Sequence, residues 1–322
     1  MAFPRWAGLL VLYVGAQLVA LVLALPFKSE GLATTSNPNS AASPLPFIIA
    51  IVVAPLVILW IARRSGGLVA LRYIILGAIG ASLDLTLTAT FELVLRPTQY
   101  APPTGAGFVI DLAVGAGATV AVALTLALVV EPQWWVVDTA GFAAAGSLIA
   151  LLGISFGILP TFILLGALAV YDAIAVYRTR HMISLADVVT EMRLPILLVM
   201  PTRRGYDYPQ SGSFTAQRHI PVEEREAVFM GLGDVVIPGT LVVSAFVWLP
   251  TVPVLGGIGG NLVAALGALV GSLVGYAVLM RRVDRGTAQA GLPFLNGGAI
   301  AGYIVAYLLV FHSFSLGLSL SL

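Results

Sequence analysis

Residues 227–249 read AVFMGLGDVVIPGTLVVSAFVWL. This stretch is long enough to cross a bilayer, which requires about 20 mostly apolar residues. It contains a single charged side chain, that of Asp234. An ionisable group inside such a segment is costly and usually serves a function. We therefore predict a transmembrane helix that carries a functional carboxyl group.

The composition of the whole chain agrees with a membrane protein. Of the 322 residues, 59% are apolar and 10% are charged, whereas a soluble domain has about 25% charged residues. The mean hydropathy of +1.00 indicates a multi-pass protein of the cell membrane, surrounded by the lipid bilayer. A net charge of +1 argues against a nucleic-acid partner. The absence of cysteine excludes disulfides, thiolate metal sites and a thiol nucleophile.

Long apolar runs bounded by charges, prolines or glycines predict an all-α polytopic bundle of nine transmembrane helices. The first run is longer than the apolar core of a signal peptide, so we interpret it as a span. The nine runs lie near residues 6–26, 46–62, 68–94, 107–130, 134–152, 156–177, 227–249, 254–280 and 292–315.

The basic residues give an orientation to this bundle. If nine helices alternate, most basic side chains fall on the side of the N-terminus, whereas Lys28 and Arg96 fall on the other. The positive-inside rule then places the N-terminus in the cytoplasm and the C-terminus outside. The chain divides into residues 1–177 with six helices, a cytoplasmic loop at 178–226, and residues 227–322 with three helices. The basic side chains on the cytoplasmic side are Arg5, Arg63, Arg64, Arg178, Arg180, Arg193, Arg203, Arg204, Arg218, Arg225, Arg281, Arg282 and Arg285.

Six acidic residues lie within the predicted spans. For Glu92, Asp111 and Asp138 we favour a solvated helix end or a packing hydrogen bond, and for Asp84 a structural hydrogen bond over a proton relay. The other two are Asp172 and Asp234, on consecutive spans. At 1.5 Å per helical residue, Asp172 lies roughly 9 Å inside the boundary given by Arg178, and Asp234 roughly 12 Å inside that given by Glu226. These two carboxyls are therefore predicted at similar depth.

Two carboxyls at one depth can carry out aspartic-protease chemistry. Repulsion between like charges favours a state in which one is protonated and the other ionised. The ionised group can take a proton from an attacking water, and the protonated group can donate to the developing oxyanion. Elimination agrees, because no histidine begins a His-Glu-x-x-His motif. His181 and His219 lie in the predicted loop, and His312 lies near the end of the last span.

The surroundings of both acids resemble a known family. Tyr171-Asp172 and Gly231-Leu232-Gly233-Asp234 resemble the Tyr-Asp and Gly-x-Gly-Asp (GxGD) motifs of the presenilin and signal peptide peptidase family of intramembrane aspartyl proteases. Nine spans, with the largest loop between the two motifs, are similar to an archaeal-type presenilin homologue. The family's Pro-Ala-Leu motif corresponds to Pro293-Phe294-Leu295. Its larger phenylalanine bears on the pocket wall and substrate preference more than on the chemistry.

This resemblance implies an intramembrane aspartyl endopeptidase, which cleaves transmembrane segments or signal peptides without a metal or cofactor. It implies that Asp172 and Asp234 are catalytic. Its partners would be transmembrane-helix substrates, and homo-oligomerisation is left open. The residues expected to support the active site or bind substrate are Tyr171, Gly231, Leu232, Gly233, Pro293, Phe294 and Leu295.

The loop contains a short apolar segment, 195–201, between two prolines and after a predicted polar helix at 184–193. It is too short to span, so we hypothesise a strand or extended edge that pairs with the unwound substrate. A hydrophobic patch on the bilayer or against the seventh span is an equal alternative. In the eighth span, small residues repeat at intervals of four and predict tight helix contact.

Two other functions are compatible with these residues. A cation or proton-coupled transporter or channel could use Asp84, Asp172 and Asp234 as binding or relay groups. A non-catalytic scaffold ranks last, because it leaves the matched acids unexplained.

Overall fold

The computed structural model describes residues 7–95, 106–179, 197–202, 227–254, 257–283 and 289–318. Long helices dominate these residues, as the apolar runs predict. The helices are α1 (Ala7–Ser29), α2 (Leu45–Ala62), α3 (Gly67–Leu95), α4 (Ala106–Val130), α5 (Trp134–Ser155), α6 (Ile158–Ile174), α9 (Leu232–Trp248), α10 (Gly260–Val283) and α11 (Leu292–Phe311). A π-helical turn, η1 (Ala175–Thr179), extends α6, and the strands are β1 (Leu197–Pro201) and β2 (Ala227–Gly231).

Eight of these helices are long and apolar enough to cross a membrane, and α9 is a shorter apolar helix. The predicted polytopic helical fold is therefore confirmed in its class. The strands β1 and β2 are an exception to the all-α prediction.

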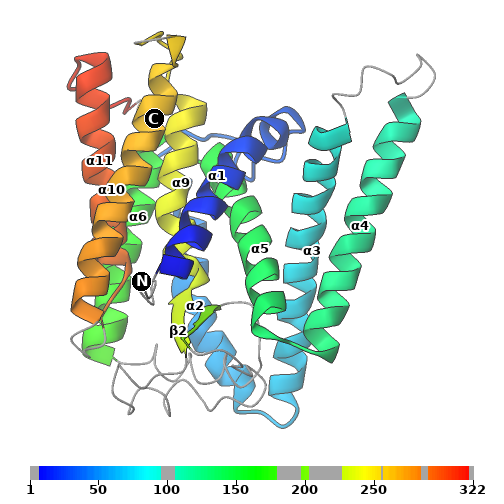
Figure 1. The fold of residues 1–322 in the computed structure, drawn as a ribbon. Coiled ribbons are helices and arrows are strands. Elements are labelled where there is room, and N and C mark those ends of the chain that lie inside the picture. Colours follow the sequence, from blue (N-terminus) through cyan, green and yellow to red (C-terminus); the bar gives the residue numbers. More distant parts are fainter. Residues whose placement is uncertain are drawn as a thin grey trace.

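The bundle is ordered from one end to the other (Figure 1). The hairpin of α10 and α11 lies at one end and that of α3 and α4 at the other, with α1, α5 and α9 between them. The largest buried core joins α1, α5, α6, α9, α10 and α11. The helix α2 contacts α3 and α6, and Pro55 is its one buried residue.

The two strands form an antiparallel sheet in which Leu197 pairs with Gly231 and Pro201 with Ala227. Of the two alternatives for residues 195–201, the strand is present over residues 197–201, and it pairs with β2. The helix predicted at 184–193 lies outside the described residues. The span predicted from residue 227 begins instead as β2, and its helix starts at Leu232. The reason is that β2 pairs with β1. The backbone groups of Val228 and Met230, which face β1, can therefore find partners there without a helix.

Small residues allow α10 and α11 to pack closely, as the repeat in the eighth span predicts. A Cβ atom added to Gly271 would overlap the carbonyl oxygen of Gly298 and lie 2.8 Å from the Cα of Gly302. Gly267 and Gly275 face α11 in the same way. Backbone thus contacts backbone along this helix pair.

We expect the substitution Gly271→Ala to lower thermal stability, because the added methyl group must separate α10 from α11. Overpacking of this kind costs about 1–3 kcal/mol. The matched control is Gly297→Ala on α11, where an added Cβ meets nothing within 4 Å. Thermal melting of both purified variants in detergent checks this. Equal melting temperatures would contradict the proposed contact.

Candidate active site

Asp172 lies in the last turn of α6, and its side chain is 5% exposed. Its carboxylate Oδ2 accepts a hydrogen bond from the backbone N–H of Leu292, at 3.0 Å. The N–H of Gly291 interacts with the same carboxylate. Asp172 therefore joins the end of α6 to the start of α11, which is 120 residues away in the chain.

Asp234 lies in the first turn of α9 and is partly buried. Its carboxylate interacts with the N–H of Gly231 and, through charge, with Asp172. It also lies against Gly291, because a Cβ atom added there would be 3.0 Å from Oδ1 and 3.1 Å from Oδ2. Both carboxylates thus meet the backbone of residues 291–292.

The N-terminus of α11 supplies the electrostatic setting for these two acids. Gly291 is its N-cap residue and offers no side-chain cap, and a proline lies in the first turn. Backbone N–H groups at a helix start lack helical partners and carry partial positive charge. Asp172 supplies an acceptor to the start of α11. Asp234 lies in the first turn of α9. Two helix N-termini therefore stabilise negative charge at this site.

A tyrosine holds the segment that leads into α11. Tyr177, in η1, donates a hydrogen bond to Oε1 of Gln289 at 2.9 Å and accepts one from the N–H of Ala290 at 3.2 Å. The π-helical turn thus places Tyr177 beside the same segment that Asp172 contacts. Such turns are frequent at functional sites.

The other predicted residues fall into two groups. Tyr171, Leu232, Pro293 and Phe294 are partly buried near the two acids in sequence, and Arg282 stacks on the ring of Phe294 at 4.6 Å. Gly233 is exposed, and an added Cβ would meet nothing within 4 Å, whereas one on Gly231 would lie 3.3 Å from Oδ2 of Asp234. Leu295 is fully buried in the core.

Sequence reasoning missed Gly291, Leu292 and Tyr177. Gly291 precedes the helix-start proline at 293, and this Gly-x-Pro order was the available signal. Leu292 contributes a backbone N–H, which no residue type reveals. Tyr177 lies five residues after Asp172, but its partners become visible only through the tertiary contact.

Two of the remaining intramembrane acids, Asp84 and Asp138, lie on α3 and α5, away from the helices that carry this pair. Asp84 is exposed on α3, so burial does not support the structural hydrogen bond predicted for it. Asp138 makes the packing hydrogen bond expected of it, to β1. The side chain of Asp111 lies outside the described residues. Among the described residues, no group of three or more His, Asp or Glu could hold a metal ion.

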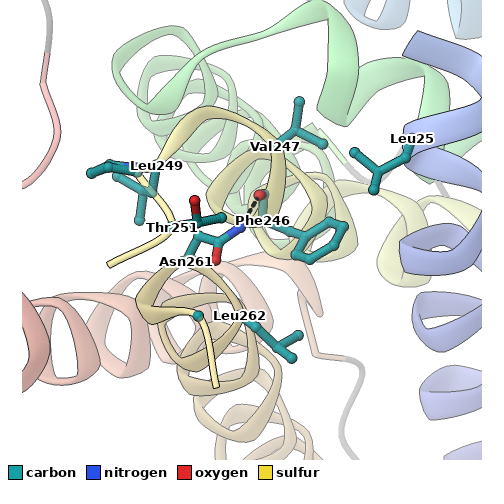
Figure 2. Close-up of a pocket in the computed structure, with 9 residues that line it drawn as sticks. Leu25, Phe246, Val247, Leu249, Thr251, Asn261 and Leu262 are labelled. Carbon is teal, nitrogen blue, oxygen red and sulfur yellow. Dashed lines mark hydrogen bonds between the residues drawn. The ribbon is translucent and has the colours of Figure 1, made fainter. Parts of the chain in front are cut away.

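One pocket among the described residues lies elsewhere (Figure 2). It has a volume of about 470 Å³ and is lined by the end of α9, the start of α10 and Leu25 of α1. There Asn261 donates a hydrogen bond to the carbonyl of Phe246, at 2.6 Å. Phe246 lies twelve residues beyond Asp234, or about 18 Å along the helix. This pocket is therefore not the site of the two carboxyls.

Comparison with known proteins agrees with the geometry. The family described as signal-peptide peptidase, presenilin aspartyl protease matches residues 9–312. A solved structure of a presenilin family intramembrane aspartate protease in space group C222 is 33% identical, with a TM-score of 0.64. The match covers 95% of this chain and 100% of that one. A second structure so described, in space group P2, is 31% identical with a TM-score of 0.63, and the match covers 96% and 100% of the two chains.

No curated relative matches this chain. Two carboxyls that lie close enough to influence each other's charge are the arrangement that aspartic proteases use. The chain belongs to the signal-peptide peptidase and presenilin family of aspartyl proteases.

We expect Gly291→Ala to lower kcat by about tenfold or more, because the new methyl group displaces the Asp234 carboxylate, and small misplacements of reacting groups are costly. The thermal melting temperature should stay close to that of the unmodified protein. The matched control is Gly166→Ala on α6, where an added Cβ meets nothing within 4 Å. Steady-state cleavage of a labelled transmembrane peptide measures the effect. Unchanged kcat in Gly291→Ala would show that the contact does not constrain Asp234.

Proposed function

We propose that Asp172 and Asp234 are the catalytic pair of this protease, one as general base and the other as general acid. The observation that carries this assignment is their convergence on the backbone of residues 291–292. Three helices, α6, α9 and α11, are needed to build the site. Family membership supports the same pair, because both acids lie in the family's motifs.

The chemistry follows from the two protonation states. The ionised carboxylate accepts a proton from water while the water oxygen attacks the peptide carbonyl carbon. The protonated carboxyl donates its proton to the carbonyl oxygen. As the tetrahedral intermediate collapses, its hydroxyl returns one proton to the general acid. The proton taken from water moves from the general base to the amide nitrogen, and the C–N bond breaks. The helix N-termini beside the pair stabilise the negative charge that moves between the groups.

The substrates are transmembrane segments of other proteins or signal peptides. A helical peptide bond is shielded by its own hydrogen bonds, so the substrate must unwind next to the pair. We propose that its extended part lies along the sheet that precedes α9. On the β1 edge away from β2, the Val199 N–H bonds Asp138 and Pro201 lacks an N–H. That edge therefore offers a substrate strand no backbone donor at Val199 or Pro201.

We also propose the nine-span topology, with the N-terminus and the 178–226 loop in the cytoplasm and the C-terminus outside the cell membrane. The helix α9 has 17 residues, or about 25 Å, which is slightly short of a hydrocarbon core of about 30 Å. The five residues of β2 add about 16 Å of extended chain. Strand and helix together are long enough to cross.

The transporter or channel alternative is not favoured. It uses Asp84 as a third binding or relay group, but this side chain is exposed on α3. The helix α3 is also not one of the helices that form the site around residues 291–292, which are α6, α9 and α11.

We expect Asp172→Asn and Asp234→Asn each to reduce cleavage by at least about a hundredfold, because each removes a group that transfers protons. The matched control is Asp84→Asn, which changes an intramembrane acid outside the pair and should cleave normally. The measurement uses purified protein with a labelled transmembrane peptide.

Cleavage that survives either substitution in the pair would refute its assignment. Ion flux in proteoliposomes, measured on the same proteins, tests the alternative. Flux that Asp172→Asn and Asp234→Asn abolish, without any proteolysis by the unmodified chain, would favour a transporter.

The topology predicts that the two termini lie on opposite sides of the membrane. Because the chain has no cysteine, Ala2→Cys and Phe314→Cys each introduce a unique label site. We expect an impermeant maleimide to label Phe314→Cys in intact cells, and Ala2→Cys only after permeabilisation. The same labelling pattern for both variants would contradict an odd number of spans.

A further inference from the structure

Asp138 is a buried acid that the proposed chemistry does not use. It lies near the start of α5 and is 5% exposed. Its Oδ1 accepts a hydrogen bond from the backbone N–H of Val199 in β1, at 2.7 Å. A carboxyl in such a place is costly unless it is hydrogen-bonded. Its partner therefore indicates its role, and that partner is a strand 61 residues away in the chain.

The hydrogen bond anchors the sheet to α5. Val199 pairs with Phe229 in the antiparallel register. Because the Val199 N–H bonds Asp138, it points to the edge of β1 that β2 does not occupy. Apolar packing adds to this anchor, since Val199 and Ala227 are buried in one cluster with Val136, Val137 and Ala140. A two-stranded sheet is marginally stable alone, so this support from α5 keeps the strands in place.

The sheet leads directly to Asp234. β2 ends at Gly231, and α9 begins at the next residue, with Asp234 in its first turn. Gly231 pairs with Leu197 of β1, and its N–H interacts with the Asp234 carboxylate. The position of β1 therefore determines the position of Gly231, and Gly231 in turn positions the carboxylate of Asp234.

We propose that Asp138 is a positioning residue for cleavage, which acts through β1 and β2 to hold Asp234 in its reactive place. This inference rests on the proposed catalytic role of Asp234. Asp138 itself does not touch the reacting atoms. It supplies a hydrogen-bond acceptor, so its charge is not required.

The test compares Asp138→Ala, Asp138→Asn and a matched control, Ser147→Ala. Ser147 is also buried on α5, and its hydroxyl bonds the carbonyls of Ala144 and Ser82 instead of the sheet. We expect Asp138→Ala to lower kcat by about tenfold or more, because the carboxylate of Asp234 leaves its reactive place. Asp138→Asn, which keeps an acceptor oxygen, should restore kcat to within about twofold, and Ser147→Ala should leave it unchanged.

Amide hydrogen exchange gives a readout that does not depend on catalysis. In Asp138→Ala, residues 197–201 and 227–231 should exchange faster than in the unmodified protein, whereas in Asp138→Asn and Ser147→Ala they should not. Unchanged exchange in Asp138→Ala would overturn the inference. So would normal kcat in that variant, or an equal loss of kcat in Ser147→Ala.

If Asp138→Ala does not fold, the asparagine variant decides, because a tenfold loss of kcat in Asp138→Asn would also refute the inference. Failure of the proposed catalytic pair is distinguishable. It would appear as cleavage by Asp234→Asn, while the exchange experiment would still report whether Asp138 holds the sheet.

Discussion

The structure depends on the hydrogen bond from the Leu292 N–H to the Asp172 carboxylate. It joins the end of α6 to the start of α11, and the neighbouring Gly291 lies against the carboxylate of Asp234 on α9. A helix start must find acceptors for its unpaired N–H groups, and within a membrane bundle water is scarce. Asp172 supplies such an acceptor to α11. Both acids lie next to positive helix ends, which favour the ionised state of whichever carboxyl acts as base. One contact therefore serves both folding and the proposed catalysis.

The elements around this contact have separate tasks. The glycine contact between α10 and α11 lets the last helix lie close to its neighbour, so that its N-terminus reaches the acids. The helix α6 adds Tyr177, which binds the segment before α11. On the other side, α5 holds the sheet that leads into α9. The contact between α10 and α11, the hydrogen bond of Tyr177 and the anchor on α5 thus position the site together.

Much of the fold could be predicted because membrane helices are long apolar runs, and most predicted bounds agree with the structure. The helix starts were wrong in two places. The eighth span was predicted from residue 254, but α10 begins at Gly260. Residues 227–231 are as apolar as a helix start but pair with β1. Apolar composition does not distinguish a buried strand from a helix, and the partner strand comes from a distant part of the chain. For the site, Asp172 and Asp234 were accessible through their depth and motifs. Gly291 and Tyr177 were not, since their importance lies in contacts with distant residues.

The sequence by itself determined that this chain is a multi-pass helical membrane protein, and that two of its acids lie in segments that resemble the family's motifs. These properties follow from composition and from residues that are close together in the sequence. The tertiary structure alone decided that both acids meet one helix N-terminus, and that Asp138 secures the sheet before α9. Contacts of this kind join residues 120 and 61 positions apart. They depend on how the helices pack. Every residue except proline has a backbone N–H, so the residue type of the donor does not reveal such a hydrogen bond.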